Sequence, residues 1–224
     1  MVNTYDVFQM VDNNIEKIID EDYTLPSFTL TYLPEFDENL QIRLGLSQTI
    51  ARPTFRELSP TLFIDVDTDR VISGSLYLEN SEIDNIDLRV EYYWGFNQFL
   101  TAGLFYKDIS KPIEEVVNES GDLIITSYQN VPSAEVTGFE IEYERIYEDL
   151  LPDSKWGSTK EFIFKMNFTA TDSEVIYSDT DTYINTQGRE VNAASLFANG
   201  RDTRLQGQSE EIANLQLGWD DLQN

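Results

Sequence analysis

The chain has 224 residues with neither cysteine nor histidine, and its 41 acidic and 15 basic residues give a formal net charge of −26. These absences exclude disulfides, thiolate metal sites, cysteine nucleophiles, a Ser-His-Asp triad and most zinc sites. The charge argues against nucleic acid and an anionic membrane surface as partners, and a hydrophobic content of 41% argues against a disordered acidic tail.

The N-terminal 22 residues show little regular pattern. They are acidic and irregular, and only residues 15–19 suggest a short strand or a turn of helix. Residues 1–6 lack the basic start and the apolar core of a signal peptide. No apolar run reaches the roughly 18 residues of a membrane-spanning helix. We therefore expect either a cytosolic protein or, as the rest of the chain favours, an internal piece of a longer precursor.

Seven stretches alternate apolar and polar residues, which is the pattern of strands with one apolar and one polar face. In residues 40–47 every even position is apolar and every odd position is polar or glycine. The same alternation recurs in residues 86–92, 139–144 and 213–219. We predict strands at residues 23–33, 39–50, 83–94, 98–110, 134–148, 160–171 and 210–219.

The connections between these strands alternate in length. Short ones would lie at one end of the strands, at residues 34–38, 95–98, 149–159 and 220–224. Long ones would lie at the other end, at residues 1–22, 51–82, 111–133 and 172–208, and the third of these suggests a hairpin from 113–117 to 123–128. Short turns opposite long loops are typical of outer-membrane barrels, whereas sandwich strands are shorter and more evenly spaced.

Aromatic residues gather near the short-turn ends and suit an interfacial girdle: Tyr32, Tyr92, Trp94, Phe162 and Trp219. We therefore predict an all-β fold, an antiparallel up-and-down meander that is part of a transmembrane β-barrel. A soluble sandwich needs the same alternation, so a soluble acidic β-domain that binds carbohydrate or a protein surface stays open as the alternative.

The polar faces of the predicted strands carry most of the candidate functional residues. In a barrel these side chains would face the lumen and stay solvated. The candidates are Arg43, Arg89, Glu91, Lys107, Glu140, Glu142 and Lys165. The opposite, lipid-facing set comprises Leu40, Ile42, Leu44, Leu88, Val90, Tyr92, Leu104, Ile141, Phe164, Leu215 and Leu217.

Two patterns that suggest chemistry are weak. Glu140 and Glu142 would lie about 6.6 Å apart on one strand face, near the spacing of a glycosidase pair, but alternating glutamates on a lumen face need no catalysis. Residues 65–69 begin like a calcium loop, yet its sixth position is Arg70 and its twelfth is Leu76, so the EF-hand pattern fails. We predict no catalytic residues, no metal site and no cofactor, and we expect that the protein is not an enzyme.

Four segments carry a further pattern: residues 25–32, 42–60, 83–107 and 128–144. The most specific is ARPTFRELSP at residues 51–60, directly after a predicted strand, with Arg52, Pro53, Phe55, Arg56 and Pro60. With these segments the chain resembles the C-terminal part of the β-barrel of TonB-dependent outer-membrane receptors. The 51–60 stretch is similar to the branch of that family often linked to carbohydrate uptake.

The resemblance implies that residues 1–224 are a partial receptor barrel domain within a roughly 22-stranded transmembrane β-barrel. It implies an N-terminal plug that contacts the polar face, the missing barrel strands, outer-membrane lipid, and the TonB complex acting through an N-terminal region absent here. It also implies location in the outer membrane of a Gram-negative bacterium and uptake of a nutrient, either a carbohydrate or a metal chelate. The ligand would bind at extracellular loops 51–82, 111–133 and 172–208, and seven strands alone could not close the barrel.

Overall fold

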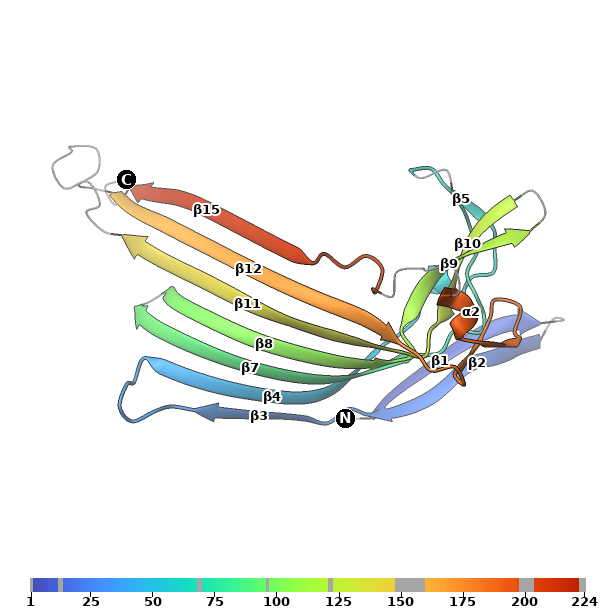
Figure 1. The fold of residues 1–224 in the computed structure, drawn as a ribbon, viewed down its shortest axis with the longest axis horizontal. Helices are drawn as coiled ribbons and strands as arrows, with labels where there is room; N and C mark the ends of the chain where they lie inside the picture. The colour runs from blue at the N-terminus through green and yellow to red at the C-terminus, as the bar shows by residue number, and fades with distance from the viewer. Residues whose placement is uncertain are drawn as a thin grey trace.

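The computed structural model describes residues 2–11, 14–67, 70–95, 97–120, 123–147, 160–197 and 204–221. Its main feature is a single curved antiparallel sheet of seven long strands (Figure 1). These strands are β3 (Ser27–Tyr32), β4 (Leu40–Ala51), β7 (Ser81–Gly95), β8 (Gln98–Ser110), β11 (Ser133–Tyr147), β12 (Lys160–Ile176) and β15 (Glu211–Asp221).

The seven strands form a meander. Their order in the sheet is β15-β12-β11-β8-β7-β4-β3, so each strand pairs with its neighbours in the sequence among these seven. All six pairings are antiparallel, and β3 and β15 are the two edges. The predicted all-β antiparallel meander is confirmed.

The two ends of the sheet differ as the connection lengths predicted. At one end, here called the turn end, β3 joins β4 through a turn in which the Asp37 amide donates to the Pro34 carbonyl at 3.3 Å. At the same end β7 joins β8 around Asn97, which has φ 53°. The predicted turn at 149–159 lies outside the described residues, and of the turn predicted at 220–224 the first two residues belong to β15 while 222–224 lie outside the described residues. The opposite end, here called the loop end, holds the long connections and their small elements (Figure 1).

The N-terminal segment corrects one expectation. Residues 1–22 were expected to be irregular, but β1 (Val2–Val11) and β2 (Asn14–Thr24) form an antiparallel hairpin that extends past the loop end (Figure 1). Apolar and polar residues do not alternate strictly in either strand, and backbone pairing needs no such alternation, so the sequence contained no signal for this hairpin. The predicted strand at 23–33 is also divided at Pro26, which has no amide hydrogen to donate: β2, before it, pairs with β1, and β3, after it, pairs with β4.

The connections at 51–82 and 111–133 join in a second sheet. It contains β5 (Phe63–Asp65), β6 (Arg70–Ile72), β9 (Ile113–Ser120) and β10 (Leu123–Asn130), in the order β5-β6-β10-β9. The predicted hairpin in 111–133 is confirmed as β9 and β10. The pairing of β6 with β10 is parallel and joins the two connections directly. Strands of three residues are too short for periodicity to predict.

The predicted loop 172–208 is shorter than expected, because β12 continues to Ile176. The remainder contains β13 (Thr182–Ile184), β14 (Glu190–Asn192) and the short helix α2 (Ala194–Phe197). The amide of Leu205 donates to Ser173 Oγ at 3.2 Å, and that of Gln206 donates to the Glu114 carboxylate at 3.2 Å. These bonds attach the end of this loop to β12 and β9.

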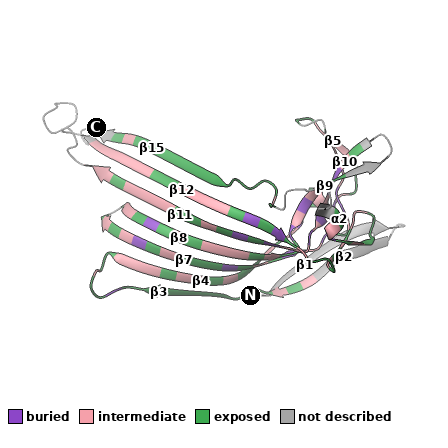
Figure 2. Cartoon of the chain, viewed as in Figure 1, coloured by how far each residue is buried: buried purple, intermediate pink, exposed green. Residues whose placement is uncertain are grey.

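The buried apolar residues of the described chain lie toward the loop end, in the long connections or in the parts of β11 and β12 beside them (Figure 2). One cluster joins Val131, Ala134 and Val175, with Tyr177 and Leu205 packed against it. By contrast, the apolar face of the main sheet is open, and Leu104 is 60% exposed and Leu217 71% exposed. Within the described ranges, no helix is long and apolar enough to span a membrane.

Candidate functional site

The strand register fixes which side chains share a face of the main sheet. Residues paired across antiparallel strands point to the same side. One apolar row runs through Leu30, Leu44, Leu88 and Leu104 to Phe139. A polar row runs from Gln41 through Glu91, Thr101, Glu142 and Asn167 to Asn214. Arg43, Arg89, Glu91, Lys107, Glu140, Glu142 and Lys165 therefore share the polar face, and its role as a lumen wall stays a prediction.

Glu91 on β7 is the centre of the polar face. Its side chain is only 3% exposed, and its carboxylate forms ion pairs with Arg89 at 3.0 Å and with Arg43 at 3.5 Å. Gln41 Nε2 donates to the same carboxylate at 2.8 Å, and the Tyr93 hydroxyl donates at 3.1 Å. A buried carboxylate needs such donors to offset its loss of hydration. Four side chains from two strands therefore stabilise the negative charge of the Glu91 carboxylate.

The network continues across the sheet. Arg89 also reaches Glu142 on β11 at 3.5 Å and donates to Thr101 on β8 at 3.3 Å. Further along, Lys165 pairs with Glu144 at 2.8 Å. The two glutamates with glycosidase-like spacing have different surroundings, because Glu142 faces Arg89 while Glu140 lies exposed opposite Gly103 and Thr169.

Nearer the loop end, Lys107 lies within a second polar group. Its Nζ donates to Asn85 Oδ1 at 2.8 Å, and Asn85 Nδ2 donates in turn to Thr49 Oγ1 at 3.0 Å. Asn85 is buried and pairs with Lys107 across β7 and β8. These polar atoms are therefore hydrogen-bonded to one another within the sheet.

The 51–60 motif forms a compact bracket at the loop end. Thr54 caps the short helix α1 (Phe55–Leu58) and forms a capping box with Glu57. Arg56 lies 4.1 Å above the Phe63 ring, and its guanidinium is 4.0 Å from Asp65. Leu58 is buried against Leu78, Ile113 and Tyr128. Of the remaining motif residues, Pro53 is buried, Arg52 is half-buried, Phe55 is 88% exposed, and the Pro60 carbonyl accepts from Ser73 Oγ.

Gly74 fixes the bracket from the other side. A Cβ at this position would lie 2.4 Å from the Glu57 carbonyl oxygen and 2.5 Å from that of Ser59. The Gly74 amide donates to the Ser59 carbonyl at 2.7 Å, and the Ser75 amide donates to that of Glu57 at 2.7 Å. Only glycine allows two backbone segments to approach this closely.

Aromatic rings meet near the turn end on the apolar face. Trp94 lies 5.8 Å from Tyr92 and 5.7 Å from Tyr143, and Tyr143 lies 5.7 Å from Phe164. The Arg145 guanidinium is 5.4 Å from the Trp94 ring. Sequence reasoning named Tyr92 and Trp94 but missed Tyr143, which becomes their neighbour only through the pairing of β8 with β11.

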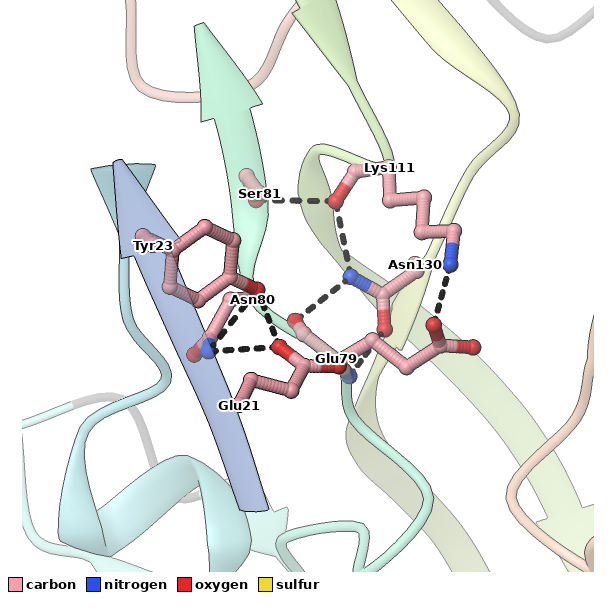
Figure 3. A network of polar contacts seen from close by, with 7 residues as sticks. All are labelled: Glu21, Tyr23, Glu79, Asn80, Ser81, Lys111 and Asn130. Atoms are coloured by element: carbon pink, nitrogen blue, oxygen red, sulfur yellow. Dashed lines mark hydrogen bonds and ion pairs between the residues drawn. The ribbon is translucent and has the colours of Figure 1, made fainter. Parts of the chain in front are cut away.

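Three segments are clamped together where the long strands end at the loop end (Figure 3). Asn130 Oδ1 accepts from the Glu79 amide at 2.8 Å, and its Nδ2 donates to the Glu79 and Lys111 carbonyls at 3.0 and 2.7 Å. Ser81 Oγ also donates to the Lys111 carbonyl at 2.8 Å, and the Lys111 ammonium pairs with the Glu79 carboxylate. The sequence contained no signal for this cluster, since its members are distant in the chain.

The N-terminal hairpin joins the same region through Tyr23 and Glu21. The Tyr23 hydroxyl donates to the Glu21 carboxylate, and Asn80 Nδ2 donates to both residues, at 3.2 and 2.9 Å (Figure 3). Burial and the acceptor Glu21 raise the pKa of Tyr23 to about 12, because both disfavour the phenolate.

A hollow of about 490 Å³ lies beside this clamp. Its walls come from the segment before β7, from the ends of β8 and β10, and from β13. Side chains at its edge include Tyr77, Glu79, Lys111, Asn130, Asp181 and Tyr183. In the part of the chain that the structure describes, no group of three or more His, Cys, Asp or Glu side chains could hold a metal ion.

Comparison with known families agrees with this geometry. The sequence matches the family described as TonB dependent receptor-like, beta-barrel, over residues 3–224. The chain belongs to this family. No curated protein matches it.

Solved structures of the ferric enterobactin receptor PfeA from Pseudomonas aeruginosa are similar in fold. The receptor in complex with BCV-L6 is 16% identical, with a TM-score of 0.47 and coverage of 94% of this chain and 34% of that one. A mutant receptor in complex with enterobactin is 15% identical, with the same coverage and TM-score. A double mutant is 20% identical, with a TM-score of 0.44 and coverage of 70% and 23%. The chain thus spans about a third or less of the solved receptors it matches.

Proposed function

We propose that this chain forms part of the barrel wall of an outer-membrane receptor that imports a nutrient with energy supplied through TonB. The observation that carries the proposal is the family match over residues 3–224. A meander whose strands separate an apolar from a polar face supports it, because a barrel wall needs lipid on one side and water on the other.

In this proposal the face with Leu44, Leu88 and Leu104 contacts lipid, and the face with Glu91 and its arginines contacts the lumen and the plug domain. The turn end is then periplasmic and the loop end extracellular, since bacterial barrels place short turns inside and long loops outside. The aromatic cluster around Trp94 would lie at the periplasmic interface. The edges β3 and β15 would pair with further strands of the same receptor.

The alternative, a soluble acidic β-domain, receives less support. A soluble sandwich buries its apolar face under a second sheet. Here Leu30, Leu104 and Leu217 on that face are each more than half exposed. In water, an open face of this kind would favour aggregation.

The test uses the full-length receptor in cells that lack other receptors for the probes. We expect the receptor to fractionate with the outer membrane and to run with heat-modifiable mobility. Uptake of a radiolabelled probe, chosen from neutral oligosaccharides and ferric enterobactin, should require both the receptor and TonB. A receptor found in the soluble fraction, or uptake that is equal in TonB-deficient cells, would overturn the proposal.

A further inference from the structure

We propose that the hollow at the loop end is a saccharide-binding site of this receptor, selective for neutral polyhydroxylated ligands over anionic metal chelates. The inference rests on the proposed function and names the ligand class that the receptor would take. It is carried by the chemistry of the walls around one cavity: Tyr77, Glu79, Lys111, Asn130, Asp181 and Tyr183.

The hollow has the volume of a ligand site. Its volume of about 490 Å³ lies within the roughly 300–1,000 Å³ of small-molecule sites. It is formed by segments distant in the sequence, including residues 77–79, 130–132 and 180–184. Such a volume has room for a short saccharide.

The polar wall is held together by several hydrogen bonds. Asn130 uses both amide atoms to hold the backbone of Glu79 and Lys111, and the Lys111 amide donates to the Pro132 carbonyl at 3.1 Å. Lys111 has φ 55°, a conformation that residues other than glycine rarely adopt. Backbone strain of this kind persists only where surrounding contacts impose it, and it is concentrated at functional sites.

This geometry presents a donor beside an acceptor. The Lys111 ammonium pairs with the Glu79 carboxylate at the edge of the hollow, and both side chains are about half exposed. An ammonium offers three donors and a carboxylate several acceptor positions, so neither is exhausted by one contact. A sugar hydroxyl donates and accepts at once, and vicinal hydroxyls match an adjacent ammonium and carboxylate.

The apolar wall supplies the complementary surface. Tyr77 is 50% exposed, and its ring lies against the backbone of Gly188, where a Cβ would approach to 2.6 Å. Gly188 has φ 72°, so glycine permits both the turn and the close contact. Tyr183 lies on β13 at the same hollow. Tyrosine offers an apolar ring and a polar tip, which suits the C–H face and the hydroxyls of a sugar.

The charge of the walls decides between the two ligand classes. Glu79 and Asp181 each carry a negative charge and Lys111 one positive charge, and Lys111 is already paired with Glu79. The chain as a whole carries a net charge of −26. An anionic chelate would be repelled on approach and would lack an arginine cluster to receive it, whereas a neutral saccharide meets neither penalty.

The test measures binding to the detergent-purified full-length receptor by titration calorimetry. The probes are neutral malto-, xylo- and galacto-oligosaccharides, with ferric enterobactin as the anionic chelate. We expect at least one oligosaccharide to bind and the chelate not to bind. Tyr77→Ala and Lys111→Met should each weaken that binding by about tenfold, the loss of one strong contact.

Arg70→Met is the matched control, because Arg70 also forms an ion pair, with Glu115 at 3.4 Å, but does not line the hollow. It should bind like the parent, and Tyr77→Phe should retain most of the affinity. Heat-modifiable mobility confirms assembly, and Tyr183→Ala replaces any variant that fails to assemble. Binding of the chelate alone, binding of no oligosaccharide, or binding unchanged in the hollow variants would overturn the inference. TonB-dependent uptake that persists in those cases would leave the proposed function standing.

Discussion

At the residue scale, Glu91 is the side chain on which the polar face depends most. It is the acceptor for Arg43, Arg89, Gln41 and Tyr93, whereas Glu140, on the same face, is exposed. The sequence predicts both glutamates equally, as polar positions in an alternating strand. Only the strand register distinguishes the buried partner of two arginines from an exposed carboxylate.

We expect Glu91→Gln to destabilise the assembled receptor by about 1–3 kcal/mol, because two arginines and two neutral donors lose a charged acceptor. The measurement is the urea midpoint of unfolding in detergent, followed by heat-modifiable mobility. Glu140→Gln is the control and should leave the midpoint nearly unchanged. Equal midpoints for the two variants would show that the Glu91 contacts contribute nothing.

Tyr23 gives a prediction about pH. Its pKa of about 12 in the folded chain compares with an ordinary value of about 10. Because the pKa is raised, the contact of the neutral Tyr23 phenol with Glu21 stabilises the folded state fully below pH 10, and this stabilisation is lost as pH rises towards 12. The difference in absorbance at the tyrosinate band between the receptor and its Tyr23→Phe variant should therefore titrate near pH 12. A transition near pH 10 would mean that the contact with Glu21 and Asn80 does not form.

At the element scale, the sequence predicted the long strands well and the short ones poorly. All seven long strands carry the period-2 pattern, and most bounds agree to within a few residues. β5 and β6 have three residues each, and the apolar and polar residues of β1 and β2 do not alternate strictly. Their pairing depends on partners far away in the chain, which local pattern does not contain.

The same limit applies to the candidate site. The 51–60 motif was identified from the sequence, but nothing in the sequence placed Gly74, elsewhere in the predicted 51–82 loop, against its backbone. The hollow likewise combines residues from 77 to 184, which share no motif. Side chains that alternate along one strand are predictable, whereas side chains that meet across loops are not.

Gly74→Ala tests the close packing of Gly74 against the backbone of the 51–60 motif. The added methyl group would overlap the Glu57 and Ser59 backbone, so the segment must shift, at a cost of roughly 1–3 kcal/mol. We expect faster proteolytic cleavage within residues 51–82 of the assembled receptor while barrel mobility on gels is retained. Gly103→Ala is the control, because its nearest atom would be 3.8 Å away. Equal cleavage rates for both variants would contradict the close packing.

At the scale of the whole molecule, the apolar face decides whether the sheet lies in a membrane. Leu88 on β7 lies in the middle of the apolar row, between Leu44 and Leu104. We expect Leu44→Arg and Leu88→Arg to cost about 2–4 kcal/mol each near the bilayer midplane and to lower the outer-membrane yield of the receptor. The measurement is the quantity of heat-modifiable receptor in the outer membrane.

Asp87→Arg is the matched control, since it places the same side chain one position earlier, on the polar face opposite Gly45. It should assemble nearly as well as the parent. Normal yields for both leucine variants, or equal losses in all three variants, would contradict the assignment of the two faces.

The parallel pairing of β6 with β10 has a consequence for the order of folding. It joins Val71 to Ile125, residues that are separated along the chain by the whole β7–β8 hairpin. Closing so long a segment in an unfolded chain carries a large entropic cost, and non-local parallel contacts form slowly. Once β7 and β8 have paired, their ends already lie together, and the remaining closure involves only the short segments beside them. We therefore expect the pairing of β6 with β10 to form after the β7–β8 hairpin, so that an assembly intermediate would expose an incomplete surface at the proposed ligand site beside a nearly complete main sheet.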